Sequence, residues 1–278
     1  MTFADVIKIC VPAMIASACV ADGPEVAEPR LVVEGYFDSD GYPEVLLNMS
    51  LVASEEGGSI GESIVRWGVV TISDGEREVV LTGGPSDKFF PPYHYYSYEM
   101  RGEPGRRYTL RASYKGREVV SSGYMHQPTP IEEIEVSHVE GCDTLRHLAV
   151  RFTAPADVPA YYHLSAQVHS AEGRMYPCMV GTHAVTEAGA AVTLPVYRAN
   201  RTTSGTDYAA DFPVGEIVTV QLARVDYPAY CFWHAFDNAA LVAGSVFVGV
   251  PGSLPGNIEG GFGVWTVQGV SARPVRVD

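Results

Sequence analysis

Short runs of apolar residues that alternate with polar ones and end at turn residues recur along this chain. Between Tyr108 and Tyr114 the apolar and aromatic side chains occupy every second position, and Thr109, Arg111 and Ser113 fill the positions between them. A period of two is typical of a β-strand with one buried face. The pattern therefore predicts strands rather than helices as the main elements of the fold.

Turn residues separate these runs. Asp74-Gly75 stands between two runs rich in β-branched residues, and both positions of such a turn tolerate a positive φ, which predicts a hairpin. The 278 residues include 28 Gly and 19 Pro, and 46% of them are hydrophobic. A chain of many short strands thus has enough apolar side chains for a packed core. We expect an all-β fold.

The length suggests one large or two ordinary domains, and the stiff segment Gln127-Pro128-Thr129-Pro130 marks the expected boundary. We expect two β-sandwich domains of the immunoglobulin or fibronectin type, over residues 30–127 and 131–278. The predicted strands of the first are 31–36, 45–50, 69–73, 79–81, 108–114 and 119–120, and those of the second are 131–139, 148–152, 161–168, 192–197 and 217–222.

One helix is expected to interrupt the second sandwich, near residues 228–243. Pro228 suits a first helical turn, and the carboxylate of Asp226 can cap it. At helical spacing, one face is formed by Ala229, Phe232, Trp233, Phe236 and Ala240. We expect this face to pack across a sheet.

The N-terminus has the pattern of an export signal. Residues 9–18 form an apolar run that is too short to span a bilayer and fits the apolar region of a signal peptide. Small residues then lead to Cys19, as in a bacterial lipobox, where the signal is cut before a Cys that carries diacylglycerol. We expect a signal peptide over 1–18 and a lipidated Cys19 that opens a flexible tether over 19–29. An ordinary cleavable signal before an incidental Cys is the alternative.

The charge balance limits the partners of the protein. The formal net charge is −14, from 19 basic and 33 acidic side chains. Nucleic acids and anionic membrane surfaces need a positively charged face. We therefore expect no nucleic-acid partner, and contact with a membrane only through the lipid anchor.

Three of the 5 cysteines would remain in the folded protein, because Cys10 would leave with the signal and Cys19 would carry the lipid. Three thiols cannot all pair. A disulfide between Cys142 and Cys178 is one alternative, and Cys231 is expected as a buried free thiol.

The order of several motifs resembles one family. The motifs are the lipobox-like Cys19, the opening Leu31-Val32-Val33-Glu34-Gly35, the hairpin Val70-Thr71-Ile72-Ser73-Asp74-Gly75, the run Pro104-Gly105-x-x-Tyr108-x-Leu110, and a glycine-rich close over 257–263. Together they resemble the Bacteroidetes lipoproteins classed as domain of unknown function 4249, over nearly the whole chain. The resemblance implies a lipoprotein of the outer membrane, often encoded beside a TonB-dependent transporter. Whether it lies on the cell-surface side or the periplasmic side of that membrane stays open. It implies no established chemistry.

The densest aromatic run is the first candidate for a binding surface. Paired prolines break strands, so we expect a loop there. Aromatic loops can stack on sugars or anchor a protein interface. Alternatively, the loop folds back over its own sandwich with its tyrosines half-buried. The candidate residues are Phe89, Phe90, Tyr93, Tyr95 and Tyr96.

The glycine-rich close is the second candidate. It lacks the Lys and Ser or Thr of a phosphate-binding loop, because Val264 and Trp265 follow its last glycine. Its glycines are expected to permit tight turns, a bulge or the close approach of another backbone. If a partner supplies that backbone, the segment is an interface, with Asn257, Gly260, Gly261 and Phe262 as its candidate residues.

No catalytic motif is present. The chain has no Gly-x-Ser-x-Gly elbow and no His-Glu-x-x-His. His163 and His169 would share a face of one strand but lie too far apart for one metal ion. We expect no cofactor, no metal and no enzymatic activity. The leading hypothesis is an accessory to a TonB-dependent transporter in nutrient capture. The alternatives are a surface adhesin or glycan-binding module, and a hydrolase whose site is assembled only in space.

Overall fold

The structure is a computed structural model, and it describes residues 28–50, 60–172, 174–198, 210–243 and 254–278. The predicted signal peptide, Cys19 and most of the tether therefore lie outside the described residues. No helix among the described residues is long and apolar enough to span a membrane.

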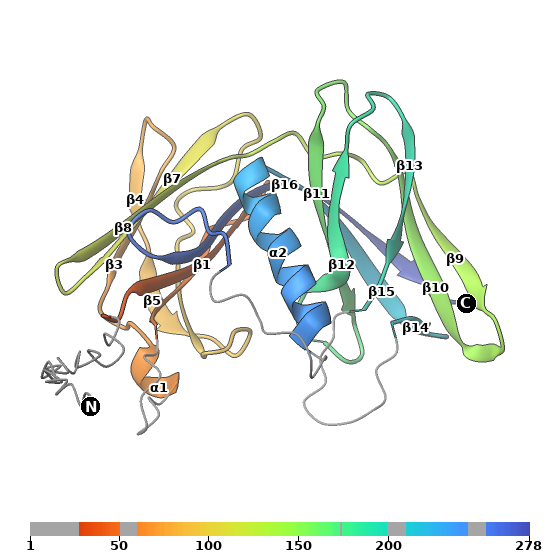
Figure 1. Ribbon diagram of the computed structural model, residues 1–278, viewed down its shortest axis with the longest axis horizontal. Coiled ribbons are helices and arrows are strands. Elements are labelled where there is room, and N and C mark those ends of the chain that lie inside the picture. The colour runs from red at the N-terminus through yellow and green to blue at the C-terminus, as the bar shows by residue number, and fades with distance from the viewer. Residues whose placement is uncertain (1–27, 51–59, 173, 199–209, 244–253) are drawn as a thin grey trace, which may run out of the picture.

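The described chain is mostly strand, with one long helix, as predicted (Figure 1). The first half contains β1 (Leu31–Asp38), β2 (Glu44–Met49), α1 (Ile60–Ser63), β3 (Val69–Ser73), β4 (Glu78–Val80), β5 (Thr82–Pro85), β6 (Tyr93–Tyr96), β7 (Arg107–Tyr114) and β8 (Arg117–Tyr124). The second half contains β9 (Glu133–Val139), β10 (Cys142–Thr153), β11 (Ala160–Val168), β12 (Tyr176–Val185), β13 (Ala191–Val196), β14 (Phe212–Pro213), β15 (Ile217–Val225), α2 (Tyr227–Ala243) and β16 (Phe262–Arg276).

Each predicted strand overlaps an observed one, but several strands were missed. The aromatic β6 was expected as a loop, and β5, β12, β14 and β16 were not predicted as strands. β5 is Thr-Gly-Gly-Pro, and β16 contains Gly269 and Pro274. Glycine and proline are depleted in strands, so the local pattern pointed away from these elements.

Two sandwiches share one sheet. The eight-stranded sheet runs in the order β12-β11-β15-β16-β1-β2-β6-β5. A sheet of order β4-β3-β7-β8 packs on its first-half strands, and a sheet built from β13, β10, β14 and β9 packs on its second-half strands. The predicted class, an all-β fold with two sandwiches and one packed helix, is confirmed.

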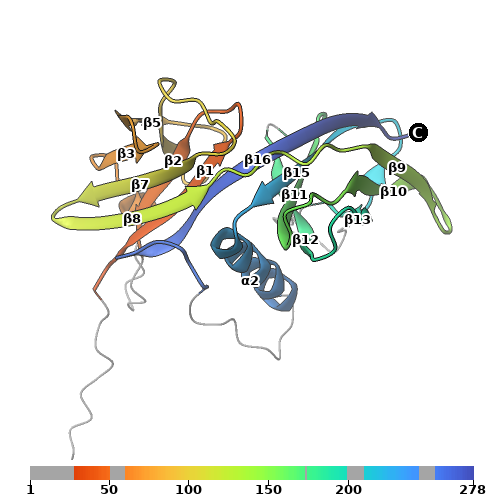
Figure 2. The same cartoon turned by 90° about the horizontal axis from the view of Figure 1, so that it is seen from above.

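The closing strand β16 belongs to both sandwiches. Its first half, 262–268, pairs in parallel with β1, and its second half, 268–276, pairs in an antiparallel manner with β15. Figure 2 shows β16 running from one group of strands into the other. The predicted second domain of 131–278 therefore needs correction, because residues 262–268 complete the sheet of the first unit. Parallel pairing with a strand more than 200 residues away leaves no trace in a local pattern.

The linker segment predicted as the domain boundary passes over β16. Residues 125–132 form no strand, and a Cβ atom on Gly269 would overlap the carbonyl oxygen of His126. The linker and β16 thus pass between the units in close contact, and Thr129 is tied to the second unit by a 3.0 Å hydrogen bond between its hydroxyl and that of Tyr162.

The Asp74-Gly75 hairpin forms as predicted, but its mechanism differs. Only Gly75 has a positive φ, of 92°. Asp74 instead accepts hydrogen bonds at Oδ1 from the backbone N–H groups of Glu76, at 3.0 Å, and Arg77, at 2.8 Å. Aspartate commonly fixes turns in this way. The turn has four residues, because the N–H of Asp74 bonds to the carbonyl of Arg77.

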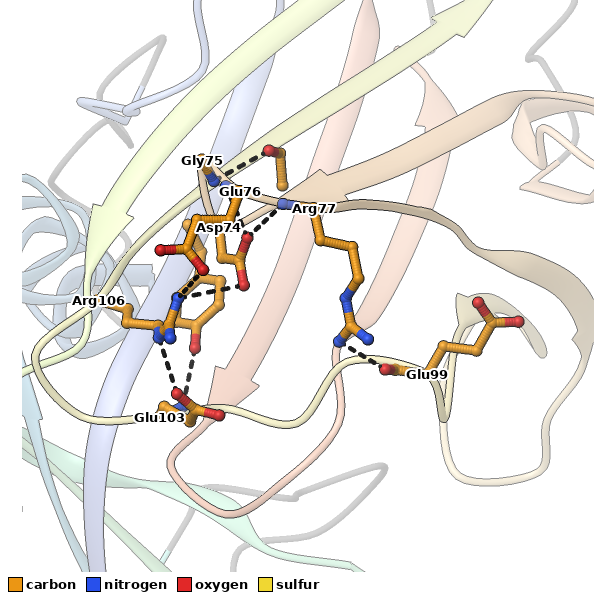
Figure 3. Close-up of polar contacts among 9 residues, drawn as sticks. Asp74, Gly75, Glu76, Arg77, Glu99, Glu103 and Arg106 are labelled. Atoms are coloured by element: carbon orange, nitrogen blue, oxygen red, sulfur yellow. Dashed lines mark hydrogen bonds and ion pairs between the residues drawn. The ribbon is translucent and has the colours of Figure 1, made fainter.

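A second turn is tied to this hairpin (Figure 3). The guanidinium of Arg106 lies 2.7 Å from a carboxylate oxygen of Glu103 and 3.4 Å from one of Glu76. The N–H of Glu103 donates to the hydroxyl of Tyr108 at 2.8 Å. A tyrosine near a strand start that bonds back to the preceding corner is the tyrosine corner of immunoglobulin-like sandwiches. The Pro104-Gly105-x-x-Tyr108 motif is therefore structural.

Helix α2 begins as predicted, and its buried face is narrower than predicted. The N–H of Ala229 donates to Oδ1 of Asp226 at 3.1 Å, which caps the helix. Ala229 and Trp233 are buried, whereas Phe236 is 42% exposed. The prediction that Phe236 packs against a sheet is wrong, because the helix covers a cavity rather than a closed core at this point. The side chain of Ala240 lies outside the described residues.

Cys142, Cys178 and Cys231 are all free. The alternative of a Cys142–Cys178 disulfide is therefore wrong in this structure. Cys178 is buried in the core of the second sandwich, and Cys142 begins β10 beside the β9–β10 turn. Cys231 is half-buried rather than buried.

Candidate functional site

The two faces of β1 have different surroundings. Leu31, Val33 and Phe37 are buried in the core of the first sandwich. The residues between them, including Glu34 and Tyr36, are half-buried on the opposite face. On this face the ring of Tyr36 packs against Trp233 of α2.

Between α2 and the eight-stranded sheet lies a cavity of about 750 Å³. Its walls come from both units, with residues of β1, β2 and the 88–89 loop on one side and of β11, β12, β15 and α2 on the other, while β16 lies between them. The size falls within the usual range of ligand sites, and such sites are often found where two units meet.

A stack of rings forms one wall of the cavity. The indole of Trp233 lies parallel to the imidazole of His163, with ring centroids 4.6 Å apart and an interplanar angle of 16°. Tyr36 lies 6.0 Å from the indole in a stacked orientation. The indole N–H of Trp233 donates to the hydroxyl of Thr266 at 3.0 Å, which fixes the helix on β16.

Polar side chains of β1 and β16 form a second wall. The amide of Gln268 donates to Oδ1 of Asp38 at 2.6 Å, and the hydroxyl of Tyr36 donates to Glu34 at 2.8 Å. Burial raises the pKa of Asp38, and nearby Glu44 raises it further, against the effect of the Gln268 hydrogen bond. Burial and the neighbouring Glu34 hold the pKa of Tyr36 well above its usual range, so its hydroxyl remains a donor.

Arg174, in the connection between β11 and β12, borders the cavity between two rings. Its guanidinium carbon lies 5.0 Å from the centroid of Phe89 and 4.7 Å from that of Tyr176. Cation–π contacts of this kind are favourable. The pair Phe89 and Arg174 thus joins the first unit to the second across the cavity.

The burial of His163 predicts a pH-dependent loss of stability. Burial lowers the pKa of His163 to about 3, with a further contribution from His183. The unfolded chain binds a proton near pH 6.5, which the folded protein does not bind until about pH 3. The contribution of His163 is therefore complete above pH 6.5 and is lost as the pH falls toward 3. Urea unfolding at pH 7 and 4.5 should show that wild type loses about 2 kcal/mol more than His163→Phe. Equal losses would contradict this prediction.

The aromatic run folds back over its own sandwich, as one alternative proposed. Residues 93–96 form β6 rather than a loop. Tyr95 is 2% exposed, its hydroxyl donates to the carbonyl of Val65 at 2.7 Å, and it accepts the N–H of Gly68 at 2.9 Å. Tyr93 is half-buried. Neither tyrosine offers a free binding surface, because both side chains pack against the sandwich to which they belong.

The other members of the run lie in different surroundings. Phe89 is buried at the cavity, and Phe90 is 73% exposed. Tyr96 is half-buried and belongs to a surface cluster that the sequence did not indicate, with Tyr42 and Tyr98. The ring centroids of Tyr42 and Tyr98 lie 5.1 Å apart. A shallower hollow of about 670 Å³ lies beside this cluster and shares Glu44 and Lys88 with the cavity.

The glycine-rich segment 257–263 lies close to another backbone, as predicted. That backbone belongs to other strands of the same chain. A Cβ atom on Gly263 would overlap the carbonyl oxygen of Val33, and one on Gly261 would meet that of Leu31. Glu259 forms a bridge with Val120 of β8, and Gly260 packs beside it.

The remaining two candidates of this segment also have intramolecular partners. The side chain of Asn257 accepts the N–H of Trp265 and donates to its carbonyl, both at 2.8 Å. Phe262 is 39% exposed, with the guanidinium of Arg30 4.3 Å from its ring centroid. The segment therefore closes the first sandwich.

The double hydrogen bond of Asn257 predicts a structural role. We expect Asn257→Ala to lower the free energy of unfolding by about 2 kcal/mol, because both backbone groups of Trp265 lose a partner. Asn257→Asp keeps the acceptor for the N–H of Trp265 but places a carboxylate oxygen against its carbonyl oxygen, so it should also lose stability. Denaturant unfolding of the three proteins measures the difference. Unchanged stability in Asn257→Ala would instead favour the interface interpretation.

The histidines of the described residues do not form a metal site. No group of three or more His, Cys, Asp and Glu side chains in the described ranges could hold a metal ion. His163 faces the cavity, whereas His169 lies beyond the end of β11 and contacts the hydroxyl of Thr219 at 2.8 Å. The sequence did not indicate the cavity, because its walls combine isolated residues from distant strands.

Three comparisons place the chain among known proteins. No curated protein matches it. Among solved structures, a segment of two fibronectin type-III domains from chicken tenascin aligns with 14% identity and a TM-score of 0.21, over 72% of this chain and 92% of the tenascin segment. A family model described as domain of unknown function (DUF4249) matches residues 19–273. The chain, from its cysteine at position 19 almost to its end, thus belongs to the DUF4249 family.

Proposed function

We propose that this protein is a non-enzymatic outer-membrane lipoprotein that captures a nutrient for a TonB-dependent transporter. The observation that carries the proposal is the cavity of about 750 Å³ between α2 and the shared sheet. A binding protein needs such a concave, mostly apolar site with a few polar groups.

The position of β1 supports a role close to the membrane. The predicted anchor Cys19 precedes the start of β1 by 12 residues, a length that spans at most about 40 Å when extended. Since β1 itself lines the cavity, the tether would keep the cavity near a transporter in the same membrane.

A pull-down from native membranes tests this proposal. The tagged lipoprotein is solubilised in mild detergent, and co-purifying proteins are identified and quantified by mass spectrometry. We expect a TonB-dependent transporter in stoichiometric amount. The matched control is Cys19→Ser, which should leave the membrane fraction and lose the transporter. A wild-type lipoprotein that is purified alone would overturn the accessory role.

A surface glycan-binding or adhesive role is the second candidate. It is favoured by the cluster of Tyr42, Tyr96 and Tyr98, of which Tyr98 is 72% exposed. Exposed aromatic rings commonly anchor interfaces. Binding of whole cells or immobilised glycans that Tyr98→Ala removes would favour this role over the first.

A hydrolase is the third candidate, and the pair of Asp38 and Glu44 favours it. Both carboxyl groups line the cavity, and the pKa of Asp38 is raised by burial and by Glu44. A protonated acid beside a carboxylate is the arrangement of many glycosidases. Release of nitrophenol from nitrophenyl glycosides, abolished by Asp38→Asn, would support hydrolysis and contradict the proposed non-enzymatic role.

A further inference from the structure

Buried polar atoms of the cavity wall have no protein partner. Nε2 of His163 and Oε1 of Gln268 are buried without a hydrogen-bond partner among the described residues, although the two side chains are only 3% and 5% exposed. Nε of Arg174 is likewise buried without a hydrogen-bond partner among the described residues. All three residues line the cavity. Since buried polar groups in proteins are nearly always paired, this wall is suited to an occupant that forms hydrogen bonds.

To satisfy these three atoms, an occupant must supply both hydrogen-bond donors and hydrogen-bond acceptors. Oε1 of Gln268 can only accept a hydrogen bond, and Nε of Arg174 can only donate one. Burial keeps the imidazole of His163 neutral by lowering its pKa, so its two nitrogens differ in role. A hydroxyl group both donates and accepts, and it can therefore satisfy any of these atoms.

The charges of the wall disfavour a charged occupant. Carboxyl groups of Glu34, Asp38, Glu44 and Asp237 line the cavity together with the cationic Lys88 and Arg174. An anion would meet the carboxylates and a cation would meet the guanidinium, each at a cost in a partly desolvated site. A neutral ligand avoids both.

The remaining walls are apolar rings. Tyr36, Tyr176, Phe232 and Phe236 line the cavity, and Phe236 on α2 keeps 42% of its surface exposed. The C–H face of a pyranose ring is apolar and stacks on such rings, while its hydroxyls point outward to polar walls. A cavity of about 750 Å³ has room for a ligand of this kind with more than one ring.

We infer that the cavity between α2 and the shared sheet binds an uncharged saccharide of two or three rings, with Phe236 as a stacking surface and His163, Gln268 and Arg174 as hydrogen-bonding partners. The inference deepens the proposed function, on which it rests, by naming the class of nutrient.

Titration calorimetry of the full-length protein tests this inference. The probes are neutral di- and trisaccharides, namely cellobiose, maltose, lactose, xylobiose and maltotriose, with diglucosamine as the cationic analogue and digalacturonate as the anionic one. We expect saturable binding of at least one neutral probe with a Kd below about 1 mM, and at least about tenfold weaker binding of both charged probes. Binding of none of the neutral probes, or tighter binding of a charged one, overturns the inference.

Two variants place the binding in the cavity. His163→Phe preserves the stacking on Trp233 and removes the unpaired nitrogen. It should weaken binding about tenfold without lowering the thermal midpoint of the free protein. Phe236→Ala should weaken binding by a similar factor. Tyr98→Ala, in the separate surface cluster, is the matched control and should bind as wild type does. If Tyr98→Ala alone loses binding, the saccharide site is the surface cluster and the inference fails.

The two proposals fail in different experiments. A transporter that co-purifies with a protein that binds no saccharide would leave the accessory role standing and overturn the ligand class. Saccharide binding by a protein that is purified without a transporter would do the reverse.

Discussion

Gly263→Ala should destabilise the protein by at least about 3 kcal/mol and lower its thermal midpoint by on the order of 10 °C. Gly263 has a φ of 106°, a backbone angle that residues other than glycine rarely adopt. Its added Cβ would also overlap the carbonyl oxygen of Val33, its partner residue in the β1–β16 pairing. The strand pair at the centre of the eight-stranded sheet would have to separate.

A matched glycine separates the two causes. Gly105 has a similar φ of 92°, but a Cβ there would meet nothing within 4 Å. Gly105→Ala should therefore cost only the backbone strain, about 1 kcal/mol. Thermal and denaturant unfolding of both variants measures the difference. Equal effects would show that the approach of β1 to Gly263 contributes nothing, contrary to the prediction.

Trp265→Ala should cost about 3–5 kcal/mol, the usual range for removal of a large buried aromatic side chain. Trp265 is fully buried in the first core. Its indole occupies the space that the missing side chain of Gly35 leaves open, and its N–H donates to the carbonyl of Tyr108 at 3.3 Å. The variant therefore leaves a cavity and removes one hydrogen bond to that carbonyl.

Two further variants serve as comparisons for Trp265→Ala. Trp265→Phe fills part of the space and should lose less than half as much stability. Tyr98→Ala, at an exposed aromatic residue, should change stability by no more than about 0.5 kcal/mol. Denaturant midpoints with a constant slope report the differences. A loss below about 1 kcal/mol in Trp265→Ala would mean that the core does not depend on this side chain.

Local patterns predicted the strands that alternate regularly. β7 and β1 have apolar residues at every second position, and their pattern reflects burial directly. The helix was predicted because Asp226, Pro228 and the aromatic spacing lie within a few residues of one another. The Asp74-Gly75 hairpin was predicted for a partly wrong reason, since only the glycine adopts a positive φ.

The shared strand and the cavity could not be predicted in this way. β16 reads as a glycine-rich close followed by mixed residues, and its partner β1 lies at the other end of the chain. His163 and Gln268 each look like an ordinary strand residue, and only the fold brings both to one wall. Tyr95 was a candidate for binding because its aromatic character was visible, while its bonds to Val65 and Gly68 were not.

The place of β16 after all the other described strands bears on when the protein folds. A ribosome makes residues 262–276 after all the other described strands, and until then each half lacks the strand that completes its part of the shared sheet. Domains usually fold in order as they are synthesised, but here the first half must wait for residues more than 130 positions beyond its own last strand β8. We therefore expect the nascent chain not to complete its fold before β16 is synthesised, and an incompletely folded chain suits the translocation through a membrane that is proposed for this protein.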